Sequence, residues 1–441
     1  IPGGSSVING LVYMRGSEND FEYLIENNKK IDWKLIKQLY FENEKKLNIE
    51  LSSPVSTKVK KNEIVQAFIK SLKNLNFSIY ESFRGNDFSK SFIGGTYELN
   101  LKDKKRTSAL EFLEKTKLSL IESTNVKNII FDQNKAIGVT AEKGSKEVNI
   151  YCNKEVIISS GTINTPKILQ LSGIGNQKHL ESIGIKSLYN NSFVGENLRD
   201  HLQTKLFFEI NSNQNFNNII KNKIGLLKEI FKYFFFKKSL LDKGAIRAGA
   251  FCELIEKKYK YQINLLLSTG KNVSDLVSKN LRSKMFTNGI TISVNHLNPK
   301  SVGSIKIKSN NFLEDPIINP NYLSDNKNQD IESHLNGIKK IREIIKTRPL
   351  SDIIIRESSE SIDAKTDFQL IEFIKNNSTT IYHHTGTCKL GTKEDGVVDE
   401  NFKVYGVDSL RICDASIFPN SINGNTAASC YVLGKILAHI L

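Results

Sequence analysis

Short apolar runs alternate with polar residues through residues 117–160. The runs are separated by Asn, Asp, Lys and Gly, which is typical of strands joined by hairpin turns. We predict strands at Leu118 to Ile121, Val126 to Phe131, Ala136 to Ala141, Val148 to Tyr151 and Val156 to Ser159.

Other segments carry their apolar residues at helical spacing. Residues 23–75 and 165–172 read as helices, and so do Leu335 to Ile345 and Thr426 to Leu441. After Asp200 the chain mixes such helices with half-buried strands at Thr291 to Val294 and Ser304 to Ile307. This mixture of elements predicts an α+β fold.

Length and composition place the chain among ordinary globular proteins. At roughly 100–200 residues per domain, 441 residues correspond to two or three domains. The chain is 39% hydrophobic and 25% charged, which excludes a collagen-like, disulfide-stapled or mostly disordered protein. Its five cysteines are widely spaced and form no C-x-x-C, which argues against a zinc site and for a reducing compartment.

The net charge of +15 comes mainly from scattered lysines. A nucleic-acid partner would need a clustered basic stripe or a known binding module, and neither is found, so we expect no nucleic-acid partner. The aromatic, lysine-rich stretch from Leu226 to Leu241 predicts either a helix lying on a membrane surface or one packed on its own domain. No apolar run reaches the ~18 residues that a spanning helix needs.

Three small-residue segments carry candidate chemistry. Gly3 to Gly10 reads GGSSVING, and Val156 to Pro166 is an apolar strand running into a small-residue turn and a helix. A strand, a glycine turn and a helix together can present backbone N–H groups to a phosphate-bearing cofactor. We place the start of that helix at Thr165, as cap, and Pro166.

The third segment, near the C-terminus, contains two adjacent histidines. Tyr382 to Cys388 reads YHHTGTC, and Leu410 to Ser416 and Asn423 to Ala427 follow it. A histidine in a glycine-flanked turn is a general-base candidate because its charge changes near physiological pH. We expect no metal site.

In this order the segments resemble the signatures of the glucose–methanol–choline (GMC) oxidoreductases, a family that depends on FAD. Residues 161–175 match the pattern G-T-x-x-T-P-x-x-L-x-x-S-G-I-G, and Val194 to His201 resembles V-G-x-N-L-x-D-H. The resemblance covers essentially the whole chain and is closest to bacterial alcohol and choline dehydrogenases. It implies a Rossmann-like FAD-binding domain and a substrate domain with an antiparallel sheet and flanking helices.

The resemblance implies two catalytic residues. His383 would remove the hydroxyl proton of an alcohol, and His384 stands where family members often carry proline. Asn425, eleven residues after Asp414, would bind the developing alkoxide while hydride passes to flavin N5. The residues implied to contact FAD are Gly4, Ser5, Ser6, Asn9, Gly10, Val126 (through its backbone), Asp414, Ala415, Thr426 and Ala427. Asp414 can alternatively be a turn cap.

The expected domains follow from the same resemblance. Residues 1–200 form the FAD-binding region, with 23–105 partly on the substrate side; residues 201–379 form the substrate domain; residues 380–441 return to the FAD domain. The family's first βαβ unit, about 30 residues with G-x-G-x-x-G, has no counterpart before Gly3. We therefore expect a fragment that holds FAD poorly by itself.

The expected activity is oxidation of a primary alcohol to an aldehyde, with electrons passed to a quinone or carrier. The alternatives are a choline dehydrogenase, a FAD-binding hydroxynitrile lyase and an inactive fragment. We expect a cytoplasmic protein with at most a peripheral association with the inner membrane.

Overall fold

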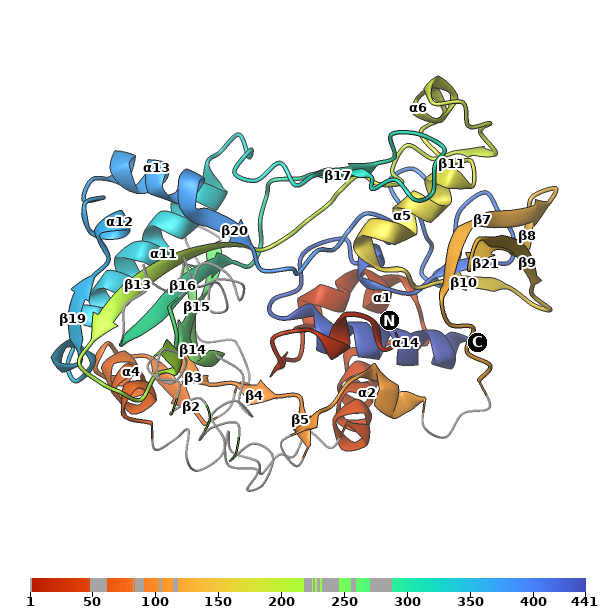
Figure 1. The fold of residues 1–441 in the computed structure, drawn as a ribbon. Coiled ribbons are helices and arrows are strands. Elements are labelled where there is room, and N and C mark those ends of the chain that lie inside the picture. The colour runs from red at the N-terminus through yellow and green to blue at the C-terminus, as the bar shows by residue number, and fades with distance from the viewer. Residues whose placement is uncertain are drawn as a thin grey trace.

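The computed structural model describes residues 2–47, 62–81, 83, 91–102, 105–113, 118–217, 224, 227, 231, 246–254, 259–269 and 288–441. Two lobes lie side by side (Figure 1). We call them the sheet lobe, built around an eight-stranded sheet, and the α14 lobe, which contains the C-terminal helix.

The sheet lobe contains a sheet ordered β19-β13-β16-β15-β14-β3-β2, with β20 also paired to β13. Its strands are β2 (Ser78–Tyr80), β3 (Phe92–Thr96), β13 (Leu202–Ile210), β14 (Ile246–Leu254), β15 (Tyr259–Leu266), β16 (Gly289–His296), β19 (Ile354–Glu357) and β20 (Ser378–Thr380). All pairs are antiparallel except β2 with β3.

Helices cover one face of this sheet. They are α4 (Glu63–Asn74), α11 (Gln329–Lys346), α12 (Ser359–Ile362) and α13 (Asp367–Asn377). Leu206, Ile263 and Ile292 of the sheet pack with Ile338 and Phe68 of the helices in one buried cluster. Burial of this apolar area is the main stabilising term, at ~25 cal/mol per Å². Helix starts are fixed by side-chain caps, such as Asn62 on α4 and the Thr366–Gln369 capping box on α13.

The α14 lobe combines segments from both ends of the sequence. Its helices are α1 (Glu22–Asn27), α2 (Trp33–Lys46), α5 (Gly161–Leu171), α6 (Gln177–Ser182) and α14 (Thr426–Ile440). Its strands are β7 (Thr124–Asp132), β8 (Lys135–Lys143), β9 (Lys146–Tyr151), β10 (Val156–Ile158), β11 (Ile174–Gly175), β12 (Tyr189–Asn190) and β21 (Leu410–Ile412). The parallel pair β10–β21 and the hairpins β7–β8–β9 form its sheets.

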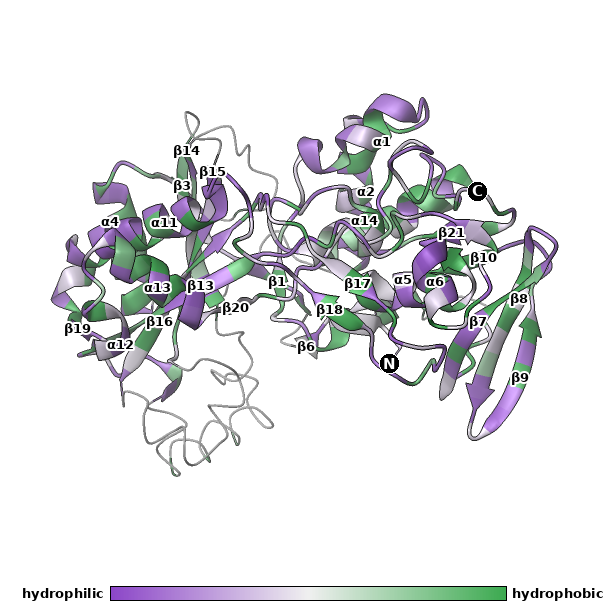
Figure 2. Ribbon diagram, turned by 90° about the horizontal axis from the view of Figure 1, so that it is seen from above, coloured by the Kyte–Doolittle hydropathy of each residue, from purple (hydrophilic) through white to green (hydrophobic). Residues whose placement is uncertain are grey.

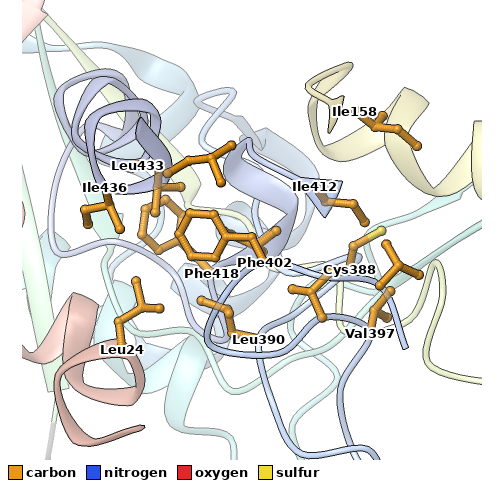
Figure 3. Close-up of a cluster of buried hydrophobic side chains, with 14 of the residues drawn as sticks. Leu24, Ile158, Cys388, Leu390, Val397, Phe402, Ile412, Phe418, Leu433 and Ile436 are labelled. Atoms are coloured by element: carbon orange, nitrogen blue, oxygen red, sulfur yellow. The ribbon is translucent and has the colours of Figure 1, made fainter. Parts of the chain in front are cut away.

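Side chains from distant parts of the sequence form the core of the α14 lobe (Figure 3). Leu24, Ile158, Phe418 and Leu433 are all at most 5% exposed and belong to the same cluster. The outer hairpins carry both hydrophilic and hydrophobic residues along their strands (Figure 2). This alternation is typical of a sheet with one solvated face.

Short elements complete the two lobes and the segments between them. They are β1 (Val12–Tyr13), β4 (Glu98–Leu99), β5 (Leu101–Lys102), β6 (Lys105–Arg106), β17 (Ser304–Lys306), β18 (Ile317–Asn319), and the 3₁₀ turns η1 (Gly4–Val7), η2 (Glu18–Phe21), η3 (Ala109–Phe112), η6 (Leu350–Asp352) and η7 (Ala415–Ile417). Met14 and Val12 pack against Phe251 and Leu297 of the sheet lobe in a third buried cluster. The sheet face opposite the helices therefore contacts the α14 lobe.

Two sequence predictions about elements are wrong. Residues 118–121 form no strand, and Leu118 and Leu120 are exposed, so this apolar run has no sheet to join. Helix α5 begins at Gly161 and contains Pro166. Pro166 donates no backbone hydrogen bond, and the carbonyl of Thr162, four residues earlier, instead accepts from Thr387 Oγ1 at 2.6 Å.

The stretch from Leu226 to Leu241 lies outside the described residues except for Leu227 and Phe231, both of which are exposed. Its two interpretations stay predictions. Within the described ranges, no helix has the length and apolar character to cross a membrane.

Candidate active site

Two histidines meet where the lobes join. His383 Nδ1 lies 3.0 Å from Nδ1 of His201, and His201 Nε2 lies 3.1 Å from the carbonyl oxygen of Leu297. A carbonyl oxygen only accepts hydrogen bonds, so His201 carries its proton on Nε2. The unprotonated Nδ1 of His201 then accepts from the Nδ1–H of His383.

Asn425 contacts the other ring nitrogen of His383. Its Nδ2 lies 3.1 Å from His383 Nε2. An amide nitrogen only donates, so Nε2 of His383 accepts and carries no proton. Both contacts are consistent with the same tautomer of His383, in which Nδ1 carries the proton and Nε2 is unprotonated and accepts from the amide of Asn425.

Asp200 holds the backbone of the histidine loop. Its Oδ1 accepts from the N–H of His383 at 3.0 Å, and its Oδ2 accepts from the hydroxyls of Tyr322 and Thr380. His384 Nε2 lies 3.4 Å from the same carboxylate. The two adjacent histidines therefore point to different partners, and only His383 reaches Asn425.

Helix α5 also fixes this loop. Thr162 Oγ1 donates to the carbonyl of His384 at 2.9 Å, and Thr387 Oγ1 donates to the Thr162 carbonyl that Pro166 leaves unpaired. Because Pro166 has no N–H, the Thr162 carbonyl is left free to accept a hydrogen bond from the loop that carries His383.

Burial keeps both histidine rings neutral. Desolvation, with smaller contributions from His201 and His384, holds the pKa of His383 well below its usual value. Burial likewise lowers the pKa of His201 to about 4. A neutral imidazole is the form that can accept a proton.

The glycine-rich N-terminal segment forms the turn η1. Gly3 and Gly4 have positive φ, and a Cβ added at Gly4 or Gly10 would meet no described atom within 4 Å. Ser6 is buried and accepts from the N–H of Ala109 at 2.9 Å, whereas Ser5 is exposed. Asn9 Oδ1 accepts from Arg106 at 2.7 Å. Backbone at Gly4 and Gly10 is therefore open to a ligand.

Asp414 connects the C-terminal segment to α5. Its Oδ2 accepts from the N–H of Gly161 at 2.9 Å and from Thr165 Oγ1 at 2.5 Å, and its Oδ1 accepts from the N–H of Ser416. Asp414 thus caps η7, which is the alternative that the sequence left open. Ala415, beside it, is half-buried.

The start of α14 lies beside His383. Asn425 is the N-cap residue but makes no side-chain cap bond, since its amide contacts His383 instead. The N-terminal N–H groups of a helix, here those of Thr426 and Ala427, suit an electron-rich ligand group. Val126 lies apart in β7 with its side chain 36% exposed.

Comparison with known proteins identifies the family. Family models described as GMC oxidoreductase match residues 1–203 and 299–434. An alcohol dehydrogenase (acceptor) of Pseudomonas putida is 30% identical, covering 100% of this chain and 81% of its own length. An oxygen-dependent choline dehydrogenase of Cronobacter sakazakii is 28% identical, covering 99% and 79%.

Solved structures show the same fold. A formate oxidase of Aspergillus oryzae superposes with a TM-score of 0.86 at 19% identity, over 99% of this chain and 83% of that one. The chain belongs to the GMC oxidoreductase family and is a FAD-dependent enzyme acting on CH–OH groups. Its fold is the family's α+β pair of a Rossmann-like FAD-binding domain and a substrate domain.

The described residues fit FAD. Open backbone at Gly4, Gly10 and Gly161 can approach a large cofactor without a clash with a side chain, and a Cβ at these positions would occupy that space. The start of α14 adds N–H donors beside His383. Within the described ranges no cluster of His, Cys, Asp or Glu could hold a metal ion.

The structure adds residues that the sequence did not assign. His201 and Asp200 position His383, and Thr162 and Thr387 hold its loop. The signal for His201 was present in the motif Val194 to His201, but only the fold places that motif against His383.

Proposed function

We propose that this enzyme oxidises a primary alcohol to an aldehyde, with His383 as the general base. The observation that supports this most strongly is the unprotonated Nε2 of His383, which is fixed from both ends of its hydrogen-bond chain. FAD, when bound, supplies the acceptor for the hydride that leaves the carbinol carbon.

His383 and Asn425 have separate roles in the proton transfer. The hydroxyl proton of the alcohol passes to Nε2 of His383. The amide of Asn425, 3.1 Å from that nitrogen, donates a hydrogen bond to the same oxygen as negative charge develops on it. The Asp200 carboxylate accepts from the backbone N–H of His383 and so holds the loop that presents the ring.

The proposal also includes an electron acceptor and a cellular location. We infer a quinone or a carrier as electron acceptor; the name of the Pseudomonas relative leaves its acceptor unspecified, and the choline dehydrogenase relative is named as oxygen-dependent. We also infer a cytoplasmic protein with at most peripheral membrane contact. Reoxidation of the reduced enzyme by a soluble quinone, compared with oxygen, tests the acceptor.

The test of the base compares two neighbouring histidines in FAD-loaded protein. His383→Ala is expected to slow anaerobic flavin reduction by an alcohol roughly 10²–10⁴-fold, because a general base contributes about that much. Flavin content measured beforehand should stay at the parent level. The matched control, His384→Ala, removes a histidine that does not reach Asn425 and should lose much less.

An unchanged reduction rate in His383→Ala would refute the base assignment. Release of cyanide from a hydroxynitrile without flavin bleaching would replace the oxidation with lyase chemistry.

A further inference from the structure

Asn425 does not behave as an ordinary helix cap. It is the N-cap residue of α14, yet its side chain makes no cap bond, and its Nδ2 lies 3.1 Å from His383 Nε2 instead. An N-cap asparagine ordinarily accepts from the second or third N–H of its own helix. The direction of the Asn425 side chain is therefore set by the residues that precede the helix.

Those preceding residues are held by a carboxylate from the other end of the sequence. Oδ1 of Asp20 accepts from the backbone N–H of Asn423 at 3.0 Å and from Asn423 Nδ2 at 2.8 Å. The same Nδ2 also lies 3.1 Å from Ser17 Oγ. Gly424, between the two asparagines, has φ +152°, a conformation that residues with a side chain rarely adopt. Asp20 thus fixes the chain two residues before the amide that contacts His383.

Asp20 is itself held in place by its own turn. Its Oδ2 accepts from the N–H of Ser17 at 2.6 Å and from Ser17 Oγ at 3.1 Å, which forms a capping box at the start of η2. Phe21, the next residue, packs edge to face on Phe418 with ring centroids 5.7 Å apart. Burial raises the pKa of Asp20, and the hydrogen bonds from Ser17 and Asn423 oppose that rise. The carboxylate therefore joins two loops by hydrogen bonds to each.

The segment that carries Asp20 also lies against α14. Gly16 approaches this helix so closely that an added Cβ would lie 2.8 Å from Ser429 Oγ. The hydroxyl of Tyr40 accepts from the N–H of Gly16 at 2.9 Å and forms a hydrogen bond with Ser429 Oγ at 2.7 Å. The backbone four residues before Asp20 is therefore attached to the helix that Asn425 begins.

From this arrangement we infer that Asp20 is a positioning residue for alcohol oxidation and holds the amide of Asn425 where it meets the alcohol oxygen. The inference rests on the proposed function, in which Asn425 donates to the developing alkoxide. Such a donor stabilises developing charge only if it is in place beforehand, and an error of about 1 Å can cost ~10²-fold in rate. Asp20 acts through Asn423 and Gly424, not on the alcohol itself.

A double-mutant cycle on FAD-loaded protein tests this role. Asp20→Asn keeps the shape but replaces one acceptor oxygen by a donor, so the side chain can satisfy Ser17 or Asn423 but not both. We expect it to slow anaerobic flavin reduction by an alcohol roughly 10–100-fold, with little change in the dissociation constant of the alcohol.

The second arm of the cycle removes the amide that Asp20 positions. Asn425→Ala should slow flavin reduction roughly 10²–10³-fold, the effect of losing one such donor. Adding Asp20→Asn to Asn425→Ala should cost less than about 3-fold more, because two residues that act as one unit do not add. A merely structural role for Asp20 would slow both backgrounds equally.

NMR of the histidine ring nitrogens gives a readout without flavin. Nε2 of His383 accepts from Asn425, and its resonance responds to loss of that hydrogen bond. In flavin-free protein, Asp20→Asn should move this resonance in the same direction as Asn425→Ala does. Asp32→Asn is the matched control, since this aspartate caps α2 through the N–H of Leu35. It should leave the resonance and the reduction rate at the parent values.

Asn423→Ala decides the question if Asp20→Asn does not fold. It removes one of the two hydrogen bonds to Asp20 Oδ1 and keeps the one from the backbone N–H, so we expect a smaller loss of rate that also disappears in the Asn425→Ala background. Equal slowing in both backgrounds, or a His383 resonance that does not move, would overturn the inference. Failure of every alcohol to reduce the flavin of the parent would instead contradict the proposed function.

Discussion

At the scale of single residues, the proton positions on His383 and His201 are inferred from neighbouring atoms that can act only as hydrogen-bond donors or only as acceptors. The Leu297 carbonyl only accepts and the Asn425 amide nitrogen only donates, and both contacts are consistent with a proton on Nε2 of His201 and on Nδ1 of His383. The sequence favoured His383 over His384 as the base. Which ring nitrogen of His383 carries the proton could be inferred only from the tertiary structure.

Arg247 carries a buried charge that has no hydrogen-bond acceptor among the described residues. Arg247 of β14 is 1% exposed, and none of its three side-chain nitrogens has an acceptor among the described residues. Its guanidinium lies 5.7 Å from the ring of Phe216, and burial lowers its pKa to about 9, so it is charged at neutral pH. A buried unpaired charge destabilises the fold.

We therefore predict that Arg247→Met stabilises the protein by roughly 1–3 kcal/mol, because the apolar replacement needs no hydration. Thermal unfolding measured by circular dichroism should show a higher midpoint. Arg348→Met, at a side chain that is 84% exposed, is the control and should change stability by less than about 0.5 kcal/mol. A large loss in Arg247→Met would show that the guanidinium has an acceptor.

At the scale of elements, two loops that are far apart in sequence fit closely together. Gly386 has φ +94°, and a Cβ there would lie 2.2 Å from the carbonyl oxygen of Asn197. Asn197 Nδ2 in turn donates to the carbonyls of Gly386 at 3.3 Å and Pro419 at 3.0 Å. The histidine loop thus packs on the segment from Val194 to His201, so two motifs that are far apart in the sequence meet in the structure.

Gly386→Ala should destabilise the protein by roughly 1–3 kcal/mol from overpacking alone, with backbone strain in addition. Gly184→Ala is the matched control: its φ is +78°, but the added Cβ meets no described atom within 4 Å, so it carries the strain without the contact. Urea unfolding of both variants gives the difference. Equal losses of stability in the two variants would mean that the Asn197 backbone moves away from the added Cβ at little cost, and that the close contact does not add to the destabilisation.

At the scale of the whole molecule, buried neutral histidines make the fold sensitive to acid. Burial lowers the pKa of His201 to about 4 and that of His334 to about 3, and it also lowers that of His383. The unfolded chain takes up these protons near pH ~6.5, whereas the folded protein does not until lower pH. Stability is therefore complete above pH ~6.5 and declines toward pH ~4.

Each such histidine should contribute a slope of roughly 1.4 kcal/mol per pH unit within that interval. Asp330, whose pKa is held low by His296 and backbone N–H groups against its own desolvation, adds a loss only at still lower pH. Urea unfolding at a series of pH values measures the slope. His334→Gln should reduce this slope by roughly 1.4 kcal/mol per pH unit, the contribution of one histidine. An unfolding free energy that does not change from pH 7 to 4 would contradict the low pKa values of the buried histidines.

The sequence by itself determined the family, the α+β class and the helices with strong periodicity, because local spacing and short motifs carry that information. It also singled out His383 and Asn425. It misplaced the start of α5, since nothing near Pro166 shows that Thr387 takes the Thr162 carbonyl. It predicted a strand at 118–121 because an apolar run does not reveal whether a partner strand exists.

Only the tertiary structure decided which groups surround His383. His201, Asp200 and Leu297 reach the site from segments about one to two hundred residues away in sequence, and strand register alone aligns Gln203, Asn295 and Gln262 on one face. Such contacts depend on the pairing of whole elements, because register sets which side of a sheet each residue faces.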